Sequence, residues 1–310
     1  MTGLGISTSG LTIRYGDTVA VDSLDLTLAP DKIYGLLGRN GSGKTSLLAV
    51  LAAFRQATSG IVQVGDADPY ENAAIMSQIA FVRDRVDAQD TDRVGCILDL
   101  AATLRPNWDA AYAERLIERF DLPLRKRLNG LSRGMKSALS VTLGLAARAP
   151  LTIFDEAYLG LDAPSRYAFY DEVLADYVAH PRTIVLSTHL IEEVGALFEE
   201  VVILHRGRLV AHEETETLRA RGTTVTGPAA AVDTFVAGRT VLGSQQLGGT
   251  RSTTVFGTLD DTDRTAARAA GLELGPIGLQ DLFVHLTADT AGTTDRTAAG
   301  ATDTKKEARR

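Results

Sequence analysis

Alternating hydrophobic and polar residues near the start of the chain predict β-strands before any long helix. Residues 11–15 and 24–28 alternate in this way, as half-buried antiparallel strands do. Two further short strands are predicted at 61–64 and 79–82, the first of them after a Ser-Gly turn. The first pair precedes a glycine-rich stretch and is expected to belong to an antiparallel subdomain.

From 94 to 149 the pattern becomes helical. Hydrophobic residues recur at the i, i+3, i+4 and i+7 spacing of one helical face, at Ala113, Leu116, Ile117 and Phe120. Either Asn107 or Asp109 is expected to cap that helix, and a second helix is expected to run from Ser132 to the stop at Pro150. This span therefore predicts a separate group of helices.

Strands and helices alternate again after residue 150. The apolar run at 151–154 predicts a strand that is buried in a parallel sheet. A helix, a strand, a short helix and a hairpin are predicted next, at 165–178, 183–186, 191–197 and 201–211. This alternation is typical of an α/β fold.

Composition shifts near Gly222, where a second unit is expected to begin. Residues 223–287 predict a small α+β unit, with strands at 239–242 and 253–256 and helices at 229–236 and 264–270. The tail 288–310 is rich in Thr, Ala, Gly and Asp and lacks large apolar residues, so we expect it to be disordered.

Composition and charge narrow the class of protein. A chain of 310 residues with 45% hydrophobic residues is long enough for about two domains with a substantial core. The net charge of −7 argues against broad binding to nucleic acid, so no nucleic-acid partner is expected. A single cysteine, Cys96, excludes an intramolecular disulfide. Neither a signal peptide nor an apolar run of about 18 residues is apparent, so an intracellular protein that does not itself span a membrane is expected.

The most specific chemistry lies in residues 38–45, which fit the pattern G-x-x-x-x-G-K-[ST] between a predicted strand and a predicted helix. Glycines let backbone N–H groups approach phosphate, and the helix directs its positive end at the same anion. Lys44 can reach the β- and γ-phosphates, and the Thr45 hydroxyl can ligate Mg²⁺. A chance glycine-rich turn is the alternative. The candidate ATP-binding residues of this loop are Gly38, Arg39, Asn40, Gly41, Ser42, Gly43, Lys44 and Thr45.

Two carboxylates end the strand predicted at 151–154. Asp155 is a candidate for holding hydrated Mg²⁺, and Glu156 is a candidate for orienting or deprotonating an attacking water. Taken alone, this pair can equally be a solvent-facing strand end. Its place downstream of the phosphate-binding loop favours a role in phosphoryl chemistry.

Four further residues complete the series. Ser132 and Gly134 open a predicted helix, where a hydroxyl, a backbone amide and the helix dipole can bind an anion. Asp162 follows the carboxylate pair in a Gly-Leu-Asp turn, and His189 ends the strand predicted at 183–186. Each of these residues alone is more often structural, as a helix cap or a surface histidine.

In this order, the motifs resemble the nucleotide-binding subunit of an ABC transporter over roughly residues 8–215. The resemblance implies that Leu-Ser-Arg-Gly-Met, at 131–135, is the signature loop and that Asp162 lies in the D-loop. It also implies that His189 contacts the γ-phosphate and that Tyr15 stacks on adenine with Val21 beside it. Phosphate-binding and signature loops of this family face each other across two subunits. ATP and Mg²⁺ are therefore the implied cofactors, bound between the subunits of a homodimer or heterodimer.

The sequence departs from the family pattern in three places. Met135 stands where Gln is usual, and Ala157-Tyr158 replaces the common Pro-Thr after Glu156. Asp84 occupies the place of the Q-loop glutamine. A carboxylate there can still ligate Mg²⁺ in the nucleotide site, or it can point away and pair with a neighbouring arginine.

The expected fold is α/β, a P-loop NTPase core of the ABC ATPase type with an antiparallel β subdomain, a helical subdomain and a small C-terminal α+β appendage. Its nucleotide-binding domain would span 1–222, with the helical subdomain at about 94–149, the appendage at 223–287 and the tail at 288–310.

The implied activity is ATP hydrolysis that powers a separate integral membrane permease. The appendage resembles that of ATPase subunits of multidrug or antibiotic exporters, which lie peripherally on the cytoplasmic face of the cell membrane. The alternative is an ABC-type ATPase that acts on nucleic acid or ribosomes without transport. One phosphate-binding loop and no sustained heptads argue against that class, and the signature loop argues against a P-loop kinase or GTPase.

Overall fold

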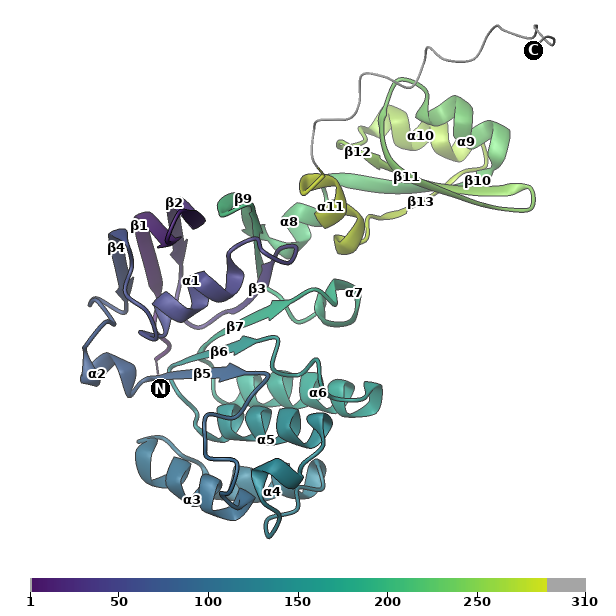
Figure 1. Ribbon diagram of the computed structural model, residues 1–310. Coiled ribbons are helices and arrows are strands. Elements are labelled where there is room, and N and C mark those ends of the chain that lie inside the picture. Colours follow the sequence, from purple (N-terminus) through teal and green to yellow (C-terminus); the bar gives the residue numbers. More distant parts are fainter. Residues whose placement is uncertain (1, 289–310) are drawn as a thin grey trace, which may run out of the picture.

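A three-stranded antiparallel sheet forms one flank of the molecule (Figure 1). The computed structural model describes residues 2–288, and in it β1 (Ile6–Tyr15) pairs with β2 (Thr18–Leu28) and with β4 (Ser59–Val64). Alternate positions of β1 are buried against the rest of the molecule. The antiparallel strands expected from the alternation are therefore confirmed.

A six-stranded sheet forms the centre, in the order β5-β6-β7-β3-β8-β9. Its strands are β3 (Ile33–Leu37), β5 (Ile79–Arg83), β6 (Leu151–Asp155), β7 (Thr183–Thr188), β8 (Glu200–His205) and β9 (Arg208–Glu214). Only β9 is antiparallel to its neighbour. Every residue of β3, β6 and β7 is buried because the sheet is covered on both faces.

Helices and the antiparallel sheet divide the two faces of the central sheet between them. The hydrophobic core on one face holds Tyr34 and Leu36 of β3 with Leu47 and Leu48. The core on the other face holds the alternate residues of β3 and the helices drawn below the sheet in Figure 1. These two sheets and the helices that accompany them form one unit, which we call the cassette. Its helices are α1 (Lys44–Leu51), α2 (Ala73–Met76), α3 (Val94–Leu104), α4 (Ala110–Arg119), a 3₁₀ turn (Leu128–Gly130), α5 (Arg133–Ala146), α6 (Ala163–Ala179), α7 (Ile191–Val194) and α8 (Thr215–Arg219).

The helical span expected at 94–149 consists of three helices, α3, α4 and α5. Of the two candidate caps, Asp109 is the one used, since its carboxylate accepts the Tyr112 N–H at 2.8 Å. The short helix expected at 191–197 ends earlier, at Val194, because Gly195 forms its C-terminal cap.

The last described segment folds around its own sheet, in the order β11-β12-β10-β13. Its elements are β10 (Gly222–Pro228), α9 (Ala229–Val236), β11 (Thr240–Leu247), β12 (Thr250–Phe256), α10 (Asp261–Ala269), β13 (Glu273–Pro276) and α11 (Leu279–Leu286). The first six elements follow the β-α-β-β-α-β pattern of a split βαβ unit. Two helices and two strands of this unit were expected from the sequence, whereas β10, β13 and α11 were not. Apart from Ala288, the tail expected to be disordered lies outside the described residues.

The final helix, α11, contacts β11 of the small sheet and also packs into the hydrophobic core of the cassette. Leu279, Leu282 and Phe283 of α11 belong to the same hydrophobic core as Ile191 and Val194 of α7. Gly195 allows this approach, since a Cβ there would lie 3.3 Å from the Leu279 side chain. The C-terminal unit is therefore joined to the cassette next to the segment that carries His189.

No helix within residues 2–288 is both long enough and apolar enough to cross a bilayer.

Candidate nucleotide-binding site

The phosphate-binding loop joins β3 to α1, as its motif requires. Gly41 and Gly43 have φ angles of 78° and 102°, in the left-handed region that glycine adopts without strain. A Cβ on Gly43 would also collide with the Ala20 carbonyl. Within the described part of the chain no side chain caps the N-terminus of α1, so its first N–H groups are available to an anion.

Lys44 lies inside this loop and is 6% exposed. Its ammonium donates a hydrogen bond to the Gly38 carbonyl at 2.7 Å and lies 4.0 Å from a carboxylate oxygen of Glu156. Burial lowers the pKa of Lys44, while Glu156 and Asp155 act in the opposite direction. A partly desolvated cation thus stands between the loop and the two carboxylates.

Asp155 ends β6 beside the loop and is buried. Burial raises the pKa of Asp155, and the Thr45 and Ser187 hydroxyls lower it to a smaller extent. Asp155 Oδ1, Ser42 Oγ and Ser187 Oγ are buried without a hydrogen-bond partner among the described residues. A carboxylate and hydroxyls with free lone pairs are the hard oxygen donors that Mg²⁺ prefers, so this group fits a Mg²⁺–nucleotide complex.

Ser187 is the site residue that the sequence motifs missed. It lies directly opposite Asp155 in the parallel pairing of β6 with β7. The signal was available, because adjacent parallel strands place the residues at their carboxyl ends side by side. Finding it required knowing that β7 is the neighbour of β6.

Glu156 and His189 are brought together from two strand ends. His189 Nδ1 lies 3.3 Å from Glu156 Oε1. Glu156 has a φ of 54°, a left-handed conformation that is unfavourable for a residue with a side chain and that aims its carboxylate at this edge. The two residues expected to act on the attacking water and the γ-phosphate are thus in contact.

Tyr15 and Val21 lie in different environments. Tyr15 is exposed at the end of β1, and the Arg55 guanidinium stands 3.9 Å above its ring centre. One face of the ring is therefore occupied by a cation, which leaves the other face for stacking. Val21 is fully buried and contacts the phosphate-binding loop at Gly43.

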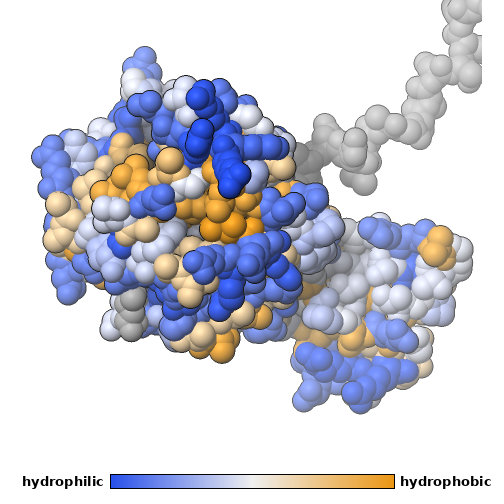
Figure 2. Space-filling view, turned by 90° about the horizontal axis from the view of Figure 1, so that it is seen from below, coloured by the Kyte–Doolittle hydropathy of each residue, from blue (hydrophilic) through white to orange (hydrophobic). Residues whose placement is uncertain are grey.

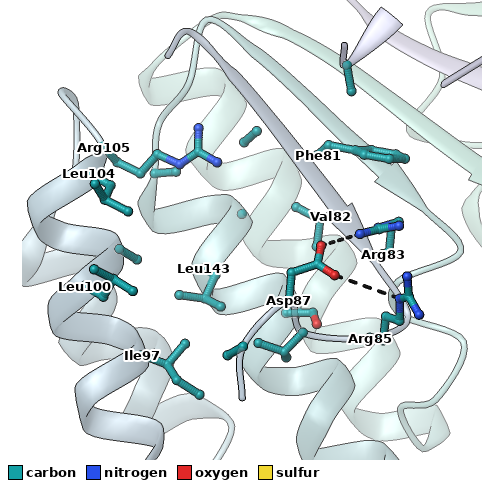
Figure 3. Close-up of a pocket in the computed structure, with 18 of the residues that line it drawn as sticks. Phe81, Val82, Arg83, Arg85, Asp87, Ile97, Leu100, Leu104, Arg105 and Leu143 are labelled. Atoms are coloured by element: carbon teal, nitrogen blue, oxygen red, sulfur yellow. Dashed lines mark hydrogen bonds and ion pairs between the residues drawn. The ribbon is translucent and has the colours of Figure 1, made fainter. Parts of the chain in front are cut away.

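Asp84 is exposed in the loop after β5. The arginines on either side of it, Arg83 and Arg85, both pair with Asp87, as Figure 3 shows. The alternative in which Asp84 pairs with a neighbouring arginine is therefore wrong. Among the described residues its carboxylate forms no ion pair.

The signature loop and the D-loop lie against each other at the surface. Ser132 caps α5 by accepting the Met135 N–H at 3.2 Å, and Asp162 caps α6 by accepting the Ser165 N–H at 2.9 Å. A Cβ on Gly134 would stand 3.2 Å from the Gly160 carbonyl. The hydrogen bonds with Ser165 lower the pKa of Asp162. Both cap residues, Ser132 and Asp162, are exposed.

Comparisons with known proteins agree with this arrangement. The family model described as ABC transporter matches residues 21–159. The daunorubicin resistance ATP-binding protein DrrA3 of Streptomyces coeruleorubidus is 30% identical over 230 residues, which cover 71% of each chain. The Nod factor export ATP-binding protein I of Ralstonia nicotianae is 30% identical over 223 residues, covering 69% of this chain and 68% of that protein.

A solved structure of an ATP-binding subunit of an ABC transporter has the same fold. It superposes with a TM-score of 0.63 at 22% identity, covering 69% of this chain and 91% of that chain. The matched region contains the phosphate-binding loop, the signature loop and the carboxylate pair, in that order along the chain. The chain therefore belongs to the ABC transporter family, in which it is an ATP-binding subunit and an ATPase.

Proposed function

We propose that this chain powers an exporter whose membrane-spanning permease is a separate polypeptide. The names of two relatives, a daunorubicin resistance protein and a Nod factor export protein, support export. The proposal that the permease is a separate chain rests on a hydrophobic groove beside the nucleotide site.

The groove has a volume of about 760 Å³ and lies between β5 and the helix α3 (Figure 3). Its walls are largely apolar. The charged groups Arg83, Arg85 and Asp87 stand at one end of it, and Arg105 lies apart from them beside Leu104. Leu100 and Leu104 of α3 are 59% and 64% exposed, which is high for leucine. In Figure 2, hydrophobic surface gathers in the middle of the face of the molecule seen from below, with hydrophilic residues around it.

An amphipathic helix from a cytoplasmic loop of the permease matches this groove in chemistry. Its apolar side would cover Leu100 and Leu104, and its polar side would meet the charged end. The wall formed by β5 pairs with β6 so that Arg83 stands opposite Asp155. Movement of a helix in the groove would therefore be passed to the end of the strand that bears the carboxylates.

In the proposed reaction, the loop N–H groups and Lys44 bind the β- and γ-phosphates. Glu156 orients the attacking water and accepts its proton, and His189 contacts the γ-phosphate. Thr45, Asp155 and Asp84 would hold Mg²⁺, which neutralises charge on the transferred phosphoryl group when it is bound. Tyr15 would stack on the adenine through its open face.

Two subunits would complete each site. We place Ser132, Gly134 and Asp162 of one subunit against the nucleotide held by the loop of the other, because both exposed helix caps lie on one surface. The active form is then a dimer, with itself or with a second cassette. ATP is supplied in the cytoplasm, so the subunit would work peripherally on the cytoplasmic face of the membrane. Residues 1–222 would form the nucleotide-binding domain and 223–287 a separate C-terminal domain.

Membrane co-purification tests the separate permease. We expect the tagged wild-type chain to bring down an integral membrane protein, and the double variant Leu100→Glu/Leu104→Glu to lose it while keeping basal ATPase activity. The matched control is Leu174→Glu on α6, which also replaces an exposed leucine (47%) but lies outside the groove. Equal recovery of the membrane protein by both variants would contradict docking in the groove. Recovery of ribosomes or nucleic acid in its place would favour the non-transport alternative.

A further inference from the structure

A buried tyrosine, Tyr158, lies next to Glu156, one of the residues proposed to catalyse ATP hydrolysis. Tyr158 follows Glu156 by two positions and is fully buried. Two successive turns fix its backbone, since the Leu159 N–H donates to the Glu156 carbonyl at 3.2 Å and the Leu161 N–H donates to the Tyr158 carbonyl at 3.1 Å. The backbone of Tyr158 is therefore rigidly linked to the left-handed Glu156.

Its ring is held by two aromatic residues of α6. It stacks on Phe169 with the ring centres 5.0 Å apart and the planes at 23°, and it meets Tyr170 edge-on at 5.6 Å. Phe169 is in turn held edge-on against Phe154 of β6. Such contacts restrict the ring to one direction, so the position of its hydroxyl is fixed as well.

The hydroxyl of Tyr158 has no hydrogen-bond partner among the described residues, although it is buried. Burial raises the pKa of the Tyr158 phenol, and the nearby Thr188 hydroxyl lowers it by less. The two segments are adjacent in the structure, because the Glu156 N–H donates to the Ser187 carbonyl at 3.3 Å, which brings Thr188 next to the turn that carries Tyr158. A buried hydroxyl without a partner destabilises a fold, and a phenylalanine would fill the same space without that disadvantage.

Thr188 connects this hydroxyl to the histidine. It is the last residue of β7, it is fully buried, and its own hydroxyl accepts the Leu190 N–H at 2.9 Å. This bond joins Thr188 to Leu190, the residues on either side of His189, and so restricts the backbone of His189. A group that bonds Thr188 from behind would therefore set the position of His189 relative to Glu156.

We propose that Tyr158 is a positioning residue for ATP hydrolysis, whose hydroxyl bonds the Thr188 hydroxyl when His189 and Glu156 engage the nucleotide. The strand ends of β6 and β7 then move as one unit. The inference rests on the proposed roles of Glu156 and His189. It gives a function to a residue that stands where the family commonly has threonine.

The test is the variant Tyr158→Phe, which keeps the ring and removes only the hydroxyl. We expect kcat for ATP hydrolysis to fall about tenfold with KM for ATP nearly unchanged, because the hydroxyl acts on the transition state and not on nucleotide binding. The melting temperature of the nucleotide-free variant should be equal to or higher than that of the wild type. A tyrosine that only fills space would leave kcat unchanged, and that result would overturn the proposal.

The matched control is Tyr170→Phe, whose hydroxyl contacts Glu193 at 3.4 Å in the same aromatic group. It should keep the wild-type kcat. Thr188→Val removes the proposed partner, so Tyr158→Phe should lower kcat no further in the Thr188→Val background. Additive losses in the double variant would contradict a shared hydrogen bond. Glu156→Gln distinguishes a failure of the proposed function from a failure of this inference. If Glu156→Gln retains full turnover, the proposed catalytic role of Glu156 is wrong. If Glu156→Gln is inactive while Tyr158→Phe keeps its activity, only the positioning role of Tyr158 is wrong.

Discussion

Several residues at the centre of the site destabilise the fold that holds them. Asp155 and Lys44 are buried charges whose pKa values are displaced by burial, and Glu156 has a left-handed backbone. Ser42 and Ser187 bury hydroxyls that have no partner in the described part of the chain. These unfavourable features coincide at the carboxyl edge of the sheet, where a charged ligand can offset them.

Asp155→Asn should raise the melting temperature of nucleotide-free protein at neutral pH. The pKa of Asp155 is raised in the folded state, so the folded protein holds this proton more tightly than the unfolded chain does. Ionisation therefore lowers the stability of the folded protein as pH rises above 3.8, the ordinary pKa of an aspartate, and the asparagine removes that loss. Thermal unfolding at several pH values checks this, and the gain should shrink as the pH approaches 4.

The same variant should lose stabilisation by nucleotide. Adding Mg²⁺ and ATP is expected to raise the melting temperature of the wild type and to have little effect on Asp155→Asn, because a metal ligand is gone. An equal shift for both proteins would show that Asp155 does not hold the metal.

Glu156→Gln should bind ATP with wild-type affinity and lower kcat by at least about 100-fold, since the amide cannot accept the proton of the attacking water. Nucleotide fluorescence gives the affinity and phosphate release gives the rate. Wild-type turnover in Mg²⁺ would remove Glu156 from the proposed mechanism.

At the scale of elements, ion pairs tie the helical group to the sheet. Asp176 of α6 is buried and lies 2.6 Å from Arg182 and 3.1 Å from Arg148. Arg148 also lies 3.1 Å from Asp109, the residue that caps α4. A single carboxylate thus connects the start of α4, the end of α5 and the segment that leads into β7.

Asp176→Asn should destabilise the protein by about 3 kcal/mol, because it leaves two arginines without their full counter-charge inside the fold. Denaturant unfolding measures the loss. Asp171→Asn, at an exposed residue five positions earlier on α6, is the control and should change stability by less than about 0.5 kcal/mol. Comparable effects of the two changes would show that the buried network contributes no more than a surface charge.

The contacts between α11 and α7 connect the C-terminal unit to the segment that carries His189. Leu279→Ala should loosen α11 from the helix that begins two residues after His189, and should change the ATPase rate without a loss of ATP affinity. Val232→Ala, in the separate core of the C-terminal unit, is the matched control and should leave the rate unchanged. Equal rates for Leu279→Ala and the wild type would make the interface purely structural.

Deletion after Gly222 is a poorer test, since it exposes Ile191, Val194 and Leu218 of the cassette core and lowers solubility.

For the whole molecule, the arrangement of loops predicts an ATP-dependent dimer. Glu156→Gln protein should double its molar mass in light scattering when ATP is added, because each signature loop would close the nucleotide site of the other subunit. Adding Gly134→Asp should prevent this while ATP binding persists. Loss of ATP binding in that variant would instead place Gly134 in the same subunit's site. A monomer under all conditions would favour a heterodimer with a second cassette.

The sequence by itself determined the family and most elements of the cassette, for a local reason. A phosphate-binding loop needs glycines and a lysine at fixed spacing, and an amphipathic strand or helix shows its period in its own residues. The strands that lead to Asp155 and His189 could therefore be found before their neighbours were known.

Only the tertiary structure decided which of these ends meet and what lies behind them. Ser187 stands beside Asp155 because β6 and β7 are neighbouring strands. Arg83 and Arg85 pair with Asp87 and not with Asp84 because of how the loop after β5 folds. The Tyr158 hydroxyl is buried without a partner among the described residues, and α11 joins the cassette core. Both outcomes arise from packing between different segments of the chain. These outcomes depend on long-range contacts, which no periodicity within a short window encodes.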